Sequence, residues 1–384
     1  MRILISAGEA SGEAYGARLM EALRQELRER GDTREPKFFG VGGEQMRQTG
    51  CELIVNAHEI AVVGLAEVVE HLPRIFRLFR RVVEAADARK PDLAVLIDFP
   101  DFNFRLAREL HKRAIPVIYY VSPQLWAWRQ SRIQLVRRYV RKMLVIFPFE
   151  ESFYQERGIK AEFVGHPLAD LPAPPIDRGR FAELYGLDPE RTWIALLPGS
   201  RRGEVTRIFP ALLKAAQLLR PDYVYIVPVA STLEPRWMTA FLAGSTGPRV
   251  VFTSDARSAL AHVRAAAVAS GTSTLEAALI GTPFVMVYRV APLTWTLGRR
   301  LVKVDRFAMV NLIAQRDVVP ELVQGDLTPE RVAAEIRRLL PDGEARQSMI
   351  ESFQDVRRRL HCMADGNASR TAAKAILAEL SQPA

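Results

Sequence analysis

The sequence predicts an α/β protein made of two doubly wound domains, and three observations support this fold class. Short apolar runs alternate with amphipathic helical stretches through most of the chain, which is typical of parallel sheets covered on both faces. The length of 384 residues suits two domains of roughly 100–200 residues each. Three prolines in four positions within residues 171–176 disfavour helix there and separate the two alternating series.

Composition narrows the class of protein. Hydrophobic residues make up 48% of the chain and charged residues 25%, which excludes a disordered, collagenous or low-complexity protein. Cys51 and Cys362 lie far apart, so neither a disulfide framework nor a cysteine zinc site is expected, and a reducing cytoplasm suits the chain. We find no secretory signal peptide and no stretch near the ~18 apolar residues of a membrane span. The net charge of +9 leaves nucleic acid, an anionic membrane surface and an anionic substrate open as partners.

The first domain is expected to span residues 1–170. Its candidate strands are the apolar, β-rich runs 2–6, 38–41, 93–98, 116–121, 143–147 and 162–164. Amphipathic segments such as 16–30 and 104–113 lie between these runs and predict helices that cover a parallel sheet.

The second domain is expected over residues 171–345. Its candidate strands are 193–197, 223–229, 249–252, 265–269 and 283–288. Thr328 and Pro329 predict a helix start, as N-cap and first helical residue. We expect the C-terminal helices, 346–384, to pack back on the first domain. Two domains of this kind predict a ligand cleft between the carboxyl ends of their sheets.

A glycine-rich segment follows the first predicted strand. Gly8, Gly12 and Gly16 allow a tight turn that brings a helix N-terminus close to a ligand, although their spacing matches neither a dinucleotide-binding loop nor a P-loop. Glu9 and Glu13 favour a pocket for hydroxyls or amines over one for phosphate. The alternative interpretation is a close strand-to-helix turn without a ligand.

Two aspartates, Asp98 and Asp101, lie at the end of the predicted strand 93–98 and just after it. Asp98 ends this apolar run, at the sheet edge where open α/β proteins bind ligands. Because a carboxylate next to a buried apolar strand costs free energy of desolvation, we expect it to have a function, and we interpret Asp98 as a candidate general base. For Asp101 we favour a turn or helix-cap role over catalysis.

An aromatic segment, 119–128, comes after the next strand. Its rings, beside Ser122 and Gln124, are suited to stack on a sugar, and packing for bulk alone is the alternative. A basic stretch predicted as helix then runs to Lys142, with no acidic residue between 129 and 149. It is either a solvated face or a surface for phosphate or anionic lipid.

Two short motifs in the second domain together predict a nucleotide-diphosphate site. Gly199 and Ser200 form a turn that offers backbone N–H groups, and Arg201 offers a guanidinium. The Ser-Gly-Thr-Ser run at 270–273 opens a helix whose N-terminus favours phosphate. Glu276, one turn in, is placed to accept two ribose hydroxyls, and a capping box with Ser273 is the alternative.

Residues 60–83 combine apolar side chains with four arginines, Arg74, Arg77, Arg80 and Arg81. An ordinary amphipathic core helix is one interpretation. A helix that lies in a membrane interface, with its arginines at anionic head groups, is the other.

The motifs occur in the order found in one protein family. They are Gly8-Glu-Ala-Ser-Gly12, Asp98-Phe-Pro-Asp-Phe-Asn103, Tyr120-Val-Ser-Pro-Gln-Leu-Trp-Ala-Trp-Arg129, Gly165-His-Pro167, Leu197-Pro-Gly-Ser-Arg201 and Ser270-Gly-Thr-Ser-Thr-Leu-Glu276. Over nearly its whole length the chain resembles the lipid-A-disaccharide synthases, which are inverting glycosyltransferases with two Rossmann-like domains in the GT-B arrangement. The tryptophan pair is the most diagnostic part. Glu13 stands where the family usually has Asp, which keeps the charge on a longer arm.

The resemblance implies a reaction and its setting. Diacylglucosamine is transferred from UDP-2,3-diacylglucosamine to 2,3-diacylglucosamine 1-phosphate through a β-1,6 bond, in the lipid A (lipopolysaccharide) biosynthesis of a Gram-negative bacterium. The first domain then binds the acceptor and the membrane, and the second binds the UDP-sugar, with no cofactor and no metal. The implied partners are the two acylated substrates and the inner-membrane surface, without nucleic acid, and a homodimer is left open. We therefore expect a cytoplasmic protein attached peripherally to the inner membrane.

The resemblance also implies roles for single residues. The residues implied to be catalytic are Asp98 and Arg201. Donor-binding residues are Gly199, Ser200, Arg201, Ser270, Gly271, Thr272, Ser273, Glu276 and Asn311. Acceptor-binding residues are Glu9, Ser11, Gly12, Glu13, Ser122, Gln124, Trp126 and Trp128. Residues in contact with the membrane are Val68, Val69, Leu72, Ile75, Phe76 and Phe79.

Two alternatives differ from this interpretation. Another UDP-sugar enzyme of the GT-B fold, such as a 2-epimerase or a related glycosyltransferase, has no use for the apolar helix at 60–83. A non-catalytic protein that binds nucleic acid or a membrane surface would use the positive net charge. Its aromatic residues, however, would need an exposed sheet or groove, whereas here they follow strand ends close to Asp98, which repels phosphates.

Overall fold

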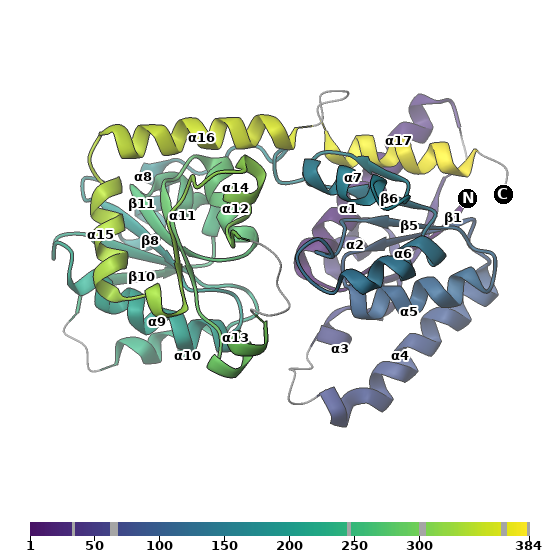
Figure 1. Ribbon diagram of the computed structural model, residues 1–384, viewed down its shortest axis with the longest axis horizontal. Coiled ribbons are helices and arrows are strands. Elements are labelled where there is room, and N and C mark those ends of the chain that lie inside the picture. The colour runs from purple at the N-terminus through teal and green to yellow at the C-terminus, as the bar shows by residue number, and fades with distance from the viewer. Residues whose placement is uncertain (33–34, 62–67, 244–246, 299–304, 362–366, 382–384) are drawn as a thin grey trace. The chain divides into compact units, whose positions relative to one another are not determined.

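The computed structural model describes the chain except for residues 33–34, 62–67, 244–246, 299–304, 362–366 and 382–384 (Figure 1). The chain divides into two compact units. Unit 1 comprises Met1–Asp170 and Leu360–Ala384, and unit 2 comprises Leu171–Arg359. Each unit contains one parallel sheet with helices, so the predicted α/β fold class is confirmed.

Unit 1 contains seven parallel strands in the order β3-β2-β1-β4-β5-β6-β7. They are β1 (Arg2–Ala7), β2 (Lys37–Gly42), β3 (Cys51–Asn56), β4 (Leu93–Ile97), β5 (Val117–Tyr120), β6 (Lys142–Val145) and β7 (Ala161–Phe163). Every residue of β4 is buried, which explains why an apolar run without alternation identified it. The sequence did not predict β3, because this strand lies at the sheet edge, includes Glu52 and is only partly buried.

The helices of unit 1 are α1 (Ala10–Glu29), α2 (Glu44–Gln48), α3 (His58–Ala61), α4 (Val68–Arg89), α5 (Pro100–His111), the 3₁₀ turn η1 (Gln130–Arg132), α6 (Ile133–Tyr139), α7 (Pro148–Gln155) and α17 (Ala368–Leu380). Helix α1 begins before its predicted start, so Gly12 and Gly16 lie inside the helix and not in a turn. A Cβ on Gly16 would lie 3.0 Å from Met46 Sδ and 3.3 Å from Ile97 Cδ1. The glycine therefore lets α1 approach the sheet.

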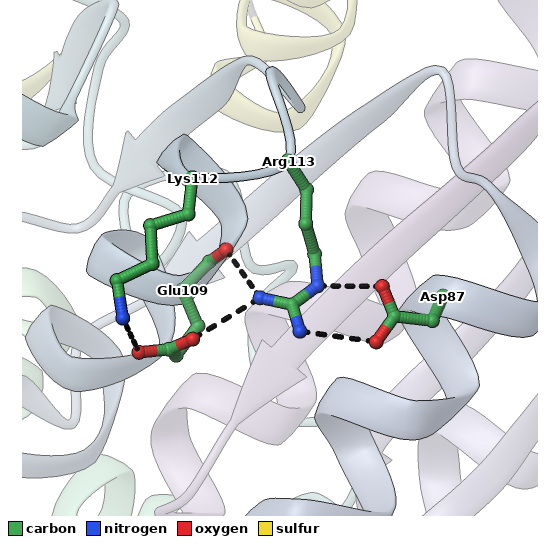
Figure 2. A network of polar contacts seen from close by, with 4 residues as sticks. All are labelled: Asp87, Glu109, Lys112 and Arg113. Carbon is green, nitrogen blue, oxygen red and sulfur yellow. Dashed lines mark hydrogen bonds and ion pairs between the residues drawn. The ribbon is translucent and has the colours of Figure 1, made fainter.

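Helix α4 is fixed to unit 1 through its C-terminal half. Its buried side chains there are Leu78, Val82, Ala85 and Ala86. Figure 2 shows how Arg113, just after α5, donates hydrogen bonds to both carboxylate oxygens of Asp87 at 2.6 and 3.0 Å. Arg113 also bonds Glu109 of α5 at 3.1 Å. This network joins α4 to α5, and the guanidinium holds the pKa of Asp87 below its usual value.

Unit 2 contains six parallel strands in the order β10-β9-β8-β11-β12-β13. They are β8 (Trp193–Leu197), β9 (Val224–Pro228), β10 (Arg249–Thr253), β11 (Ala265–Ala269), β12 (Phe284–Tyr288) and β13 (Glu321–Val323). The sequence predicted all but β13, a three-residue strand at the edge. The helices are α8 (Arg178–Tyr185), α9 (Arg202–Gln217), α10 (Pro235–Thr239), η2 (Ala240–Leu242), α11 (Ala256–His262), α12 (Thr272–Ile280), α13 (Pro292–Gly298), α14 (Met309–Ala314), η3 (Gln324–Asp326), α15 (Pro329–Leu339) and α16 (Glu344–Leu360).

The two C-terminal helices belong to different units. Helix α17 packs on α1 of unit 1, and the Ala368 backbone N–H donates to Asp170 Oδ2 at 2.6 Å. Helix α16 instead packs on the sheet of unit 2, where Phe353 stacks on Phe284 of β12 at 5.7 Å. The expectation that all of 346–384 packs on the first domain is therefore wrong for α16, whose apolar face is buried against unit 2.

Candidate functional site

Each sheet reverses its strand order once, and the glycine, Asp98, Arg201 and Gly271 motifs follow the strands at that reversal. In unit 1 the central neighbours β1 and β4 are followed by α1 and α5, and in unit 2 β8 and β11 are followed by α9 and α12. Open α/β sheets bind ligands outside the carboxyl ends of the strands at such a switch point. Glu9 and Asp98 follow the first pair of strands, and Arg201 and Gly271 follow the second.

Asp98 and Phe99 form the turn between β4 and α5. Both residues have left-handed backbones, with φ of 44° and 52°, which costs non-glycine residues roughly 1–2 kcal/mol each. Burial raises the pKa of the Asp98 carboxyl to about 6, the charge of Glu9 adds to the increase, and the Phe99 backbone N–H opposes it. Such a carboxyl is mostly ionised at neutral pH and still takes up a proton, as a general base must.

A buried network of hydrogen bonds fixes the backbone of the Asp98–Phe99 turn. The Asn103 side-chain amide donates to the carbonyls of Asp98 at 2.8 Å and Ile97 at 3.2 Å. Its oxygen accepts the Ser6 hydroxyl at 2.7 Å, and the Tyr119 hydroxyl donates to the Asp98 carbonyl at 2.5 Å. No role was predicted from the sequence for Asn103, Ser6 and Tyr119. A polar side chain inside an otherwise apolar helix face, as at Asn103, was the available signal.

Gly8 is required by the same turn. A Cβ at position 8 would lie 2.3 Å from the ring of Phe99, and that ring stacks on Phe102 at 5.4 Å. Only a residue without a side chain fits between β1 and the Phe99 ring. The glycine motif thus serves close packing at the switch point.

The residues predicted to bind the acceptor on α1 differ in their surroundings. Glu9 is exposed and Ser11 is half-buried in the first turn of α1, whereas Gly12 is buried. Glu13 accepts the Gln45 backbone N–H at 2.6 Å and so caps the N-terminus of α2, whose own N-cap, Gly43, has no side chain. The longer arm of Glu13 therefore has a structural partner within unit 1.

The aromatic segment after β5 is partly internal and partly exposed. Ser122 is buried and shares a 2.7 Å hydrogen bond with the Tyr154 hydroxyl. The Trp126 indole donates to Glu150 at 3.1 Å. Gln124 is exposed, and Trp128 is 39% exposed with the Arg129 guanidinium 4.4 Å above its ring. Gln124 and Trp128 are thus available to a ligand, while Ser122 and Trp126 shape the segment.

Glu150 is fully buried beneath the aromatic segment. Burial raises the pKa of its carboxyl to about 8, although hydrogen bonds from the Phe147 backbone and the Trp126 indole oppose the increase. Its two oxygens accept from Trp126 and from the Phe147 N–H at 3.2 Å. The carboxyl therefore ties the segment to the start of α7.

The basic stretch at 129–142 does not form the single helix that the sequence predicted. It comprises η1, α6 and the start of β6, where Lys142 pairs with Glu162 at 2.5 Å. Arg129 and Arg132 pair with Asp101 in the first turn of α5. Asp101 lies inside the first turn of α5 and is not its N-cap, which is Phe99. The predicted cap or turn role is therefore replaced by ion pairs with Arg129 and Arg132 inside unit 1.

The loop after β8 does not offer its amides freely. Glu204 accepts the backbone N–H groups of Ser200 at 3.2 Å and Arg201 at 3.4 Å, so the expected Gly-Ser turn for phosphate is already occupied by a carboxylate. Gly199, with φ of 116° and Glu204 close above it, makes room for this contact. The Arg201 side chain is 73% exposed and lies 3.6 Å from Glu204, so its guanidinium is the accessible donor of this loop.

The start of α12 has the geometry of an anion site. Gly271 is its N-cap, with φ of 146°, and apart from its chain neighbours no atom of the described residues lies within 4 Å of the position that a Cβ would take. No side chain of the N-cap covers the first amides, which belong to Thr272 and Ser273. Ser270, just before, donates its hydroxyl to the Phe307 carbonyl at 3.2 Å.

Glu276 lies beyond the first turn of α12. Because the N-cap is Gly271, Thr274 occupies the capping-box position, and the capping-box alternative for Glu276 is wrong. Burial raises the pKa of the Glu276 carboxyl, and the charge of Arg257 partly opposes the increase. A desolvated carboxyl at this point suits the hydroxyls of a ribose.

Asn311, which was predicted to bind the donor, makes its hydrogen bonds inside unit 2. It is 1% exposed. Its amide donates to the Val319 carbonyl at 2.9 Å and to Glu321 at 2.8 Å, and its oxygen accepts the N–H groups of Val318 and Val319. These four bonds use its main hydrogen-bonding groups, so Asn311 fixes the 315–320 loop from inside.

The predicted membrane residues on α4 separate into three groups. The side chains of Val68, Val69 and Leu72 lie outside what the structure describes. Phe76 is 56% exposed and Ile75 is half-buried. Phe79 is partly buried, packs on the core and meets Phe102 edge to face at 5.4 Å, so its ring fills space between α4 and α5.

Two features are absent from the part of the chain that the structure describes. Within it, no three or more His, Cys, Asp or Glu side chains gather as a metal site would require. None of the helices traced there combines the length and apolarity needed to cross a bilayer.

Comparison with known proteins agrees with the motifs. A family model described as lipid-A-disaccharide synthetase matches residues 3–373. The lipid-A-disaccharide synthase of Koribacter versatilis is 57% identical over 380 residues, which cover 98% of each chain. That of Acidobacterium capsulatum is 49% identical over 371 residues, which cover 93% of this chain and 91% of the relative.

Solved structures confirm the fold. The calicheamicin glycosyltransferase CalG4 has a TM-score of 0.61 at 19% identity, with 99% of this chain and 98% of that chain covered. A UDP-GlcNAc 2-epimerase from Neisseria meningitidis, bound to UDP-GlcNAc, has a TM-score of 0.64 at 11% identity, with 99% of each chain covered. The two Rossmann-like units of the GT-B fold are thus common to a transferase and an epimerase, and the fold alone does not separate these activities.

Proposed function

The chain belongs to the lipid-A-disaccharide synthase family, and we propose that it transfers 2,3-diacylglucosamine from UDP to 2,3-diacylglucosamine 1-phosphate. The products are the β-1,6-linked disaccharide 1-phosphate and UDP. One observation carries the assignment: four of the six motifs shared with the family follow the carboxyl ends of β1 and β4 in unit 1 and of β8 and β11 in unit 2, and the tryptophan motif follows β5, the neighbour of β4. These are the edges at which such sheets bind ligands.

Asp98 is the general base of the proposed reaction. Its carboxylate takes the proton of the acceptor hydroxyl while that oxygen attacks the anomeric carbon of the donor. The bond from this carbon to UDP breaks as the new bond forms on the opposite face, so the configuration inverts. UDP leaves with the bonding electrons, and Asp98 ends protonated. Its pKa of about 6 suits both states near neutral pH.

The donor is assigned to unit 2. The exposed guanidinium of Arg201 and the amides of Thr272 and Ser273 at the start of α12 hold the diphosphate and stabilise the charge that develops on it. Glu276 accepts the ribose hydroxyls. Because an arginine and a helix N-terminus supply the positive charge, neither a metal nor another cofactor is needed.

The acceptor and the membrane are assigned to unit 1. Gln124 and Trp128 are exposed in the segment that follows β5, and both side chains are suited to contact a sugar. On α4, exposed Phe76 is flanked by Arg77 and Arg80, a pairing that suits the interface of an anionic bilayer. We infer that the protein works in the cytoplasm at the surface of the inner membrane.

A product analysis tests the proposal. The enzyme is incubated with UDP-2,3-diacylglucosamine, with and without the acceptor, in a chelating buffer, and the products are identified by mass spectrometry. We expect disaccharide 1-phosphate and UDP only when the acceptor is present. Conversion of the UDP-sugar into an isomer without acceptor would instead support a 2-epimerase, the alternative that shares this fold.

A further inference from the structure

The turn that carries Asp98 is under more constraint than its position at a strand end requires. Asp98 and Phe99 are two consecutive left-handed residues, and such a pair persists only where surrounding contacts over-determine it. The main chain supplies two of these contacts, from the Asp98 N–H to the Tyr120 carbonyl at 3.2 Å and from the Asn103 N–H to the Phe99 carbonyl at 3.0 Å. The remaining contacts come from side chains.

The carbonyl of Asp98 is held from two sides. It accepts the Asn103 amide at 2.8 Å and the Tyr119 hydroxyl at 2.5 Å, and a carbonyl oxygen has two lone pairs to offer. Both donors are completely buried, so water does not replace either of them. The orientation of the Asp98 peptide is thereby fixed.

Asn103 is itself oriented by its neighbours. Its oxygen accepts the buried hydroxyl of Ser6 on β1, and its amide also bonds the Ile97 carbonyl on β4. With Tyr119 on β5, the network links three adjacent strands at their carboxyl edge. The amide cannot turn over without breaking its bonds to both Ser6 and Asp98.

We propose that Asn103 and Tyr119 are positioning residues for catalysis, which fix the Asp98 backbone so that its carboxylate meets the acceptor hydroxyl in a reactive geometry. This inference rests on the proposed function, in which Asp98 is the base. Neither residue touches the reacting atoms. A misplacement of about 1 Å in a reacting group can cost about a hundredfold in rate, so a loosened turn should reduce turnover without weakening substrate binding.

Tyr119→Phe is the sharpest test, because it removes one hydroxyl and keeps the ring that packs on Phe104 at 5.5 Å. Ser6→Ala is the second variant, since it removes the bond that orients Asn103 without touching Asp98. Tyr225→Phe is the matched control: this tyrosine is also completely buried, and its hydroxyl donates to the Ala216 carbonyl at 3.0 Å in unit 2.

We expect Tyr119→Phe to lower kcat by about 10- to 100-fold and to leave the KM of both substrates within about threefold. Ser6→Ala should have a smaller effect of the same kind. The acidic limb of the pH profile of kcat/KM should move to lower pH in Tyr119→Phe, because a loosened turn hydrates the carboxylate and lowers its pKa. Tyr225→Phe should change thermal stability alone.

The outcomes separate this inference from the proposed function. If Asp98→Asn is inactive but Tyr119→Phe and Ser6→Ala keep the kcat and the pH profile of Tyr225→Phe, the positioning role is wrong while the base assignment stands. If Asp98→Asn itself keeps full turnover, the proposed function of Asp98 is wrong. Should Tyr119→Phe fail to fold, Ser6→Ala decides: an unchanged kcat and pH limb there would overturn the positioning role.

Discussion

As the proposed general base, Asp98 is a residue whose burial would favour catalysis at the expense of stability. Its carboxyl must be ionised to accept a proton, while burial and Glu9 raise its pKa to about 6. We therefore expect kcat/KM to fall about tenfold per pH unit below pH 6. Asp98→Asn should lose at least about a hundredfold in kcat, and Glu9→Gln should shift the acidic limb to lower pH. Steady-state kinetics from pH 5 to 8 measure all three effects, and an Asp98→Asn rate near that of the wild type would contradict them.

The same substitution should stabilise the protein. The folded-state pKa of Asp98 lies above the ordinary value of 3.8, so folding disfavours the ionised form, and this penalty is complete above pH 6 and absent below about pH 3.8. Asp98→Asn should raise the free energy of unfolding by roughly 1–3 kcal/mol at pH 7.5 and by little at pH 4. Urea denaturation at the two pH values measures it, with Glu21→Gln, at an exposed site, as the control.

Substitutions in the two donor motifs should have different effects, one on kcat and the other on UDP affinity. Arg201→Ala should lower kcat by about 10²–10³-fold, because the guanidinium acts on charge that develops as UDP leaves. Glu276→Ala should instead weaken UDP binding by about tenfold, as expected for lost hydrogen bonds to the ribose. The neighbouring Arg202, paired with Glu234 at 3.1 Å, is the matched control. Calorimetric UDP titration and turnover assays would contradict the assignment if Arg202→Ala matched Arg201→Ala.

Residues at the site were predictable where a side chain conflicts with its local pattern. Asp98 stood out because a carboxylate ends a buried apolar strand. The occupied amides of Ser200 and Arg201 were not predictable, since the contact depends on how Glu204 folds back over Gly199. The internal bonds of Asn311 were not predictable either, because its partners Val318, Val319 and Glu321 are brought around it only by the tertiary structure.

Among the secondary-structure elements, α4 gives the clearest contrast between two similar residues. Phe76 is 56% exposed, whereas Phe79 packs on Phe102. Phe76→Ser should weaken binding to anionic vesicles by about tenfold, since roughly 1.5–3 kcal/mol accompanies full burial of a phenylalanine, and should leave the melting temperature unchanged. Phe79→Ser should lower stability by roughly 2–4 kcal/mol and spare vesicle affinity. Vesicle sedimentation and thermal melts separate the two, and the reverse pattern would place the interface elsewhere.

The sequence of α4 does not distinguish a core helix from a helix at a membrane interface, because both have the same helical period of apolar residues. Both phenylalanines lie within one amphipathic segment, and its arginines suit either a solvated face or a membrane surface. The distinction came from tertiary contacts: the Arg113–Asp87 pairing and the buried residues after position 77 define which part of the helix belongs to the core (Figure 2). The strands were easier, because central parallel strands are apolar along their whole length.

Across the whole molecule, the C-terminal helix depends on one buried carboxylate. Glu379 of α17 is 2% exposed and pairs with Lys160, with Lys142 and with Arg141, the last at 3.0 Å. Burial raises the pKa of Glu379, but the hydrogen bond from Lys160 and the positive charges outweigh it, and the net pKa lies below its ordinary value. Its ionised form therefore stabilises the folded unit 1.

Glu379→Gln should remove about 3–5 kcal/mol of stability at neutral pH, as expected when one partner of a buried ion pair is lost. This difference should shrink as the pH falls below 4.5 through the lowered folded-state pKa, because protonation then removes the same charge from the wild type. Urea denaturation at pH 7 and pH 3.5 measures it, with Glu21→Gln again as the control. A difference that grows with acidity would show that Glu379 is held protonated.

The return of α17 to unit 1 has a consequence for how the chain is made. Unit 2, Leu171–Arg359, is an insertion between two parts of unit 1, and the face of α1 is covered by a helix that ends only at Leu380. On the ribosome, the second unit is complete while the first still lacks this cover. Nascent unit 1 must therefore keep apolar surface unburied until α17 has left the ribosome, and during this interval the growing polypeptide most needs chaperones.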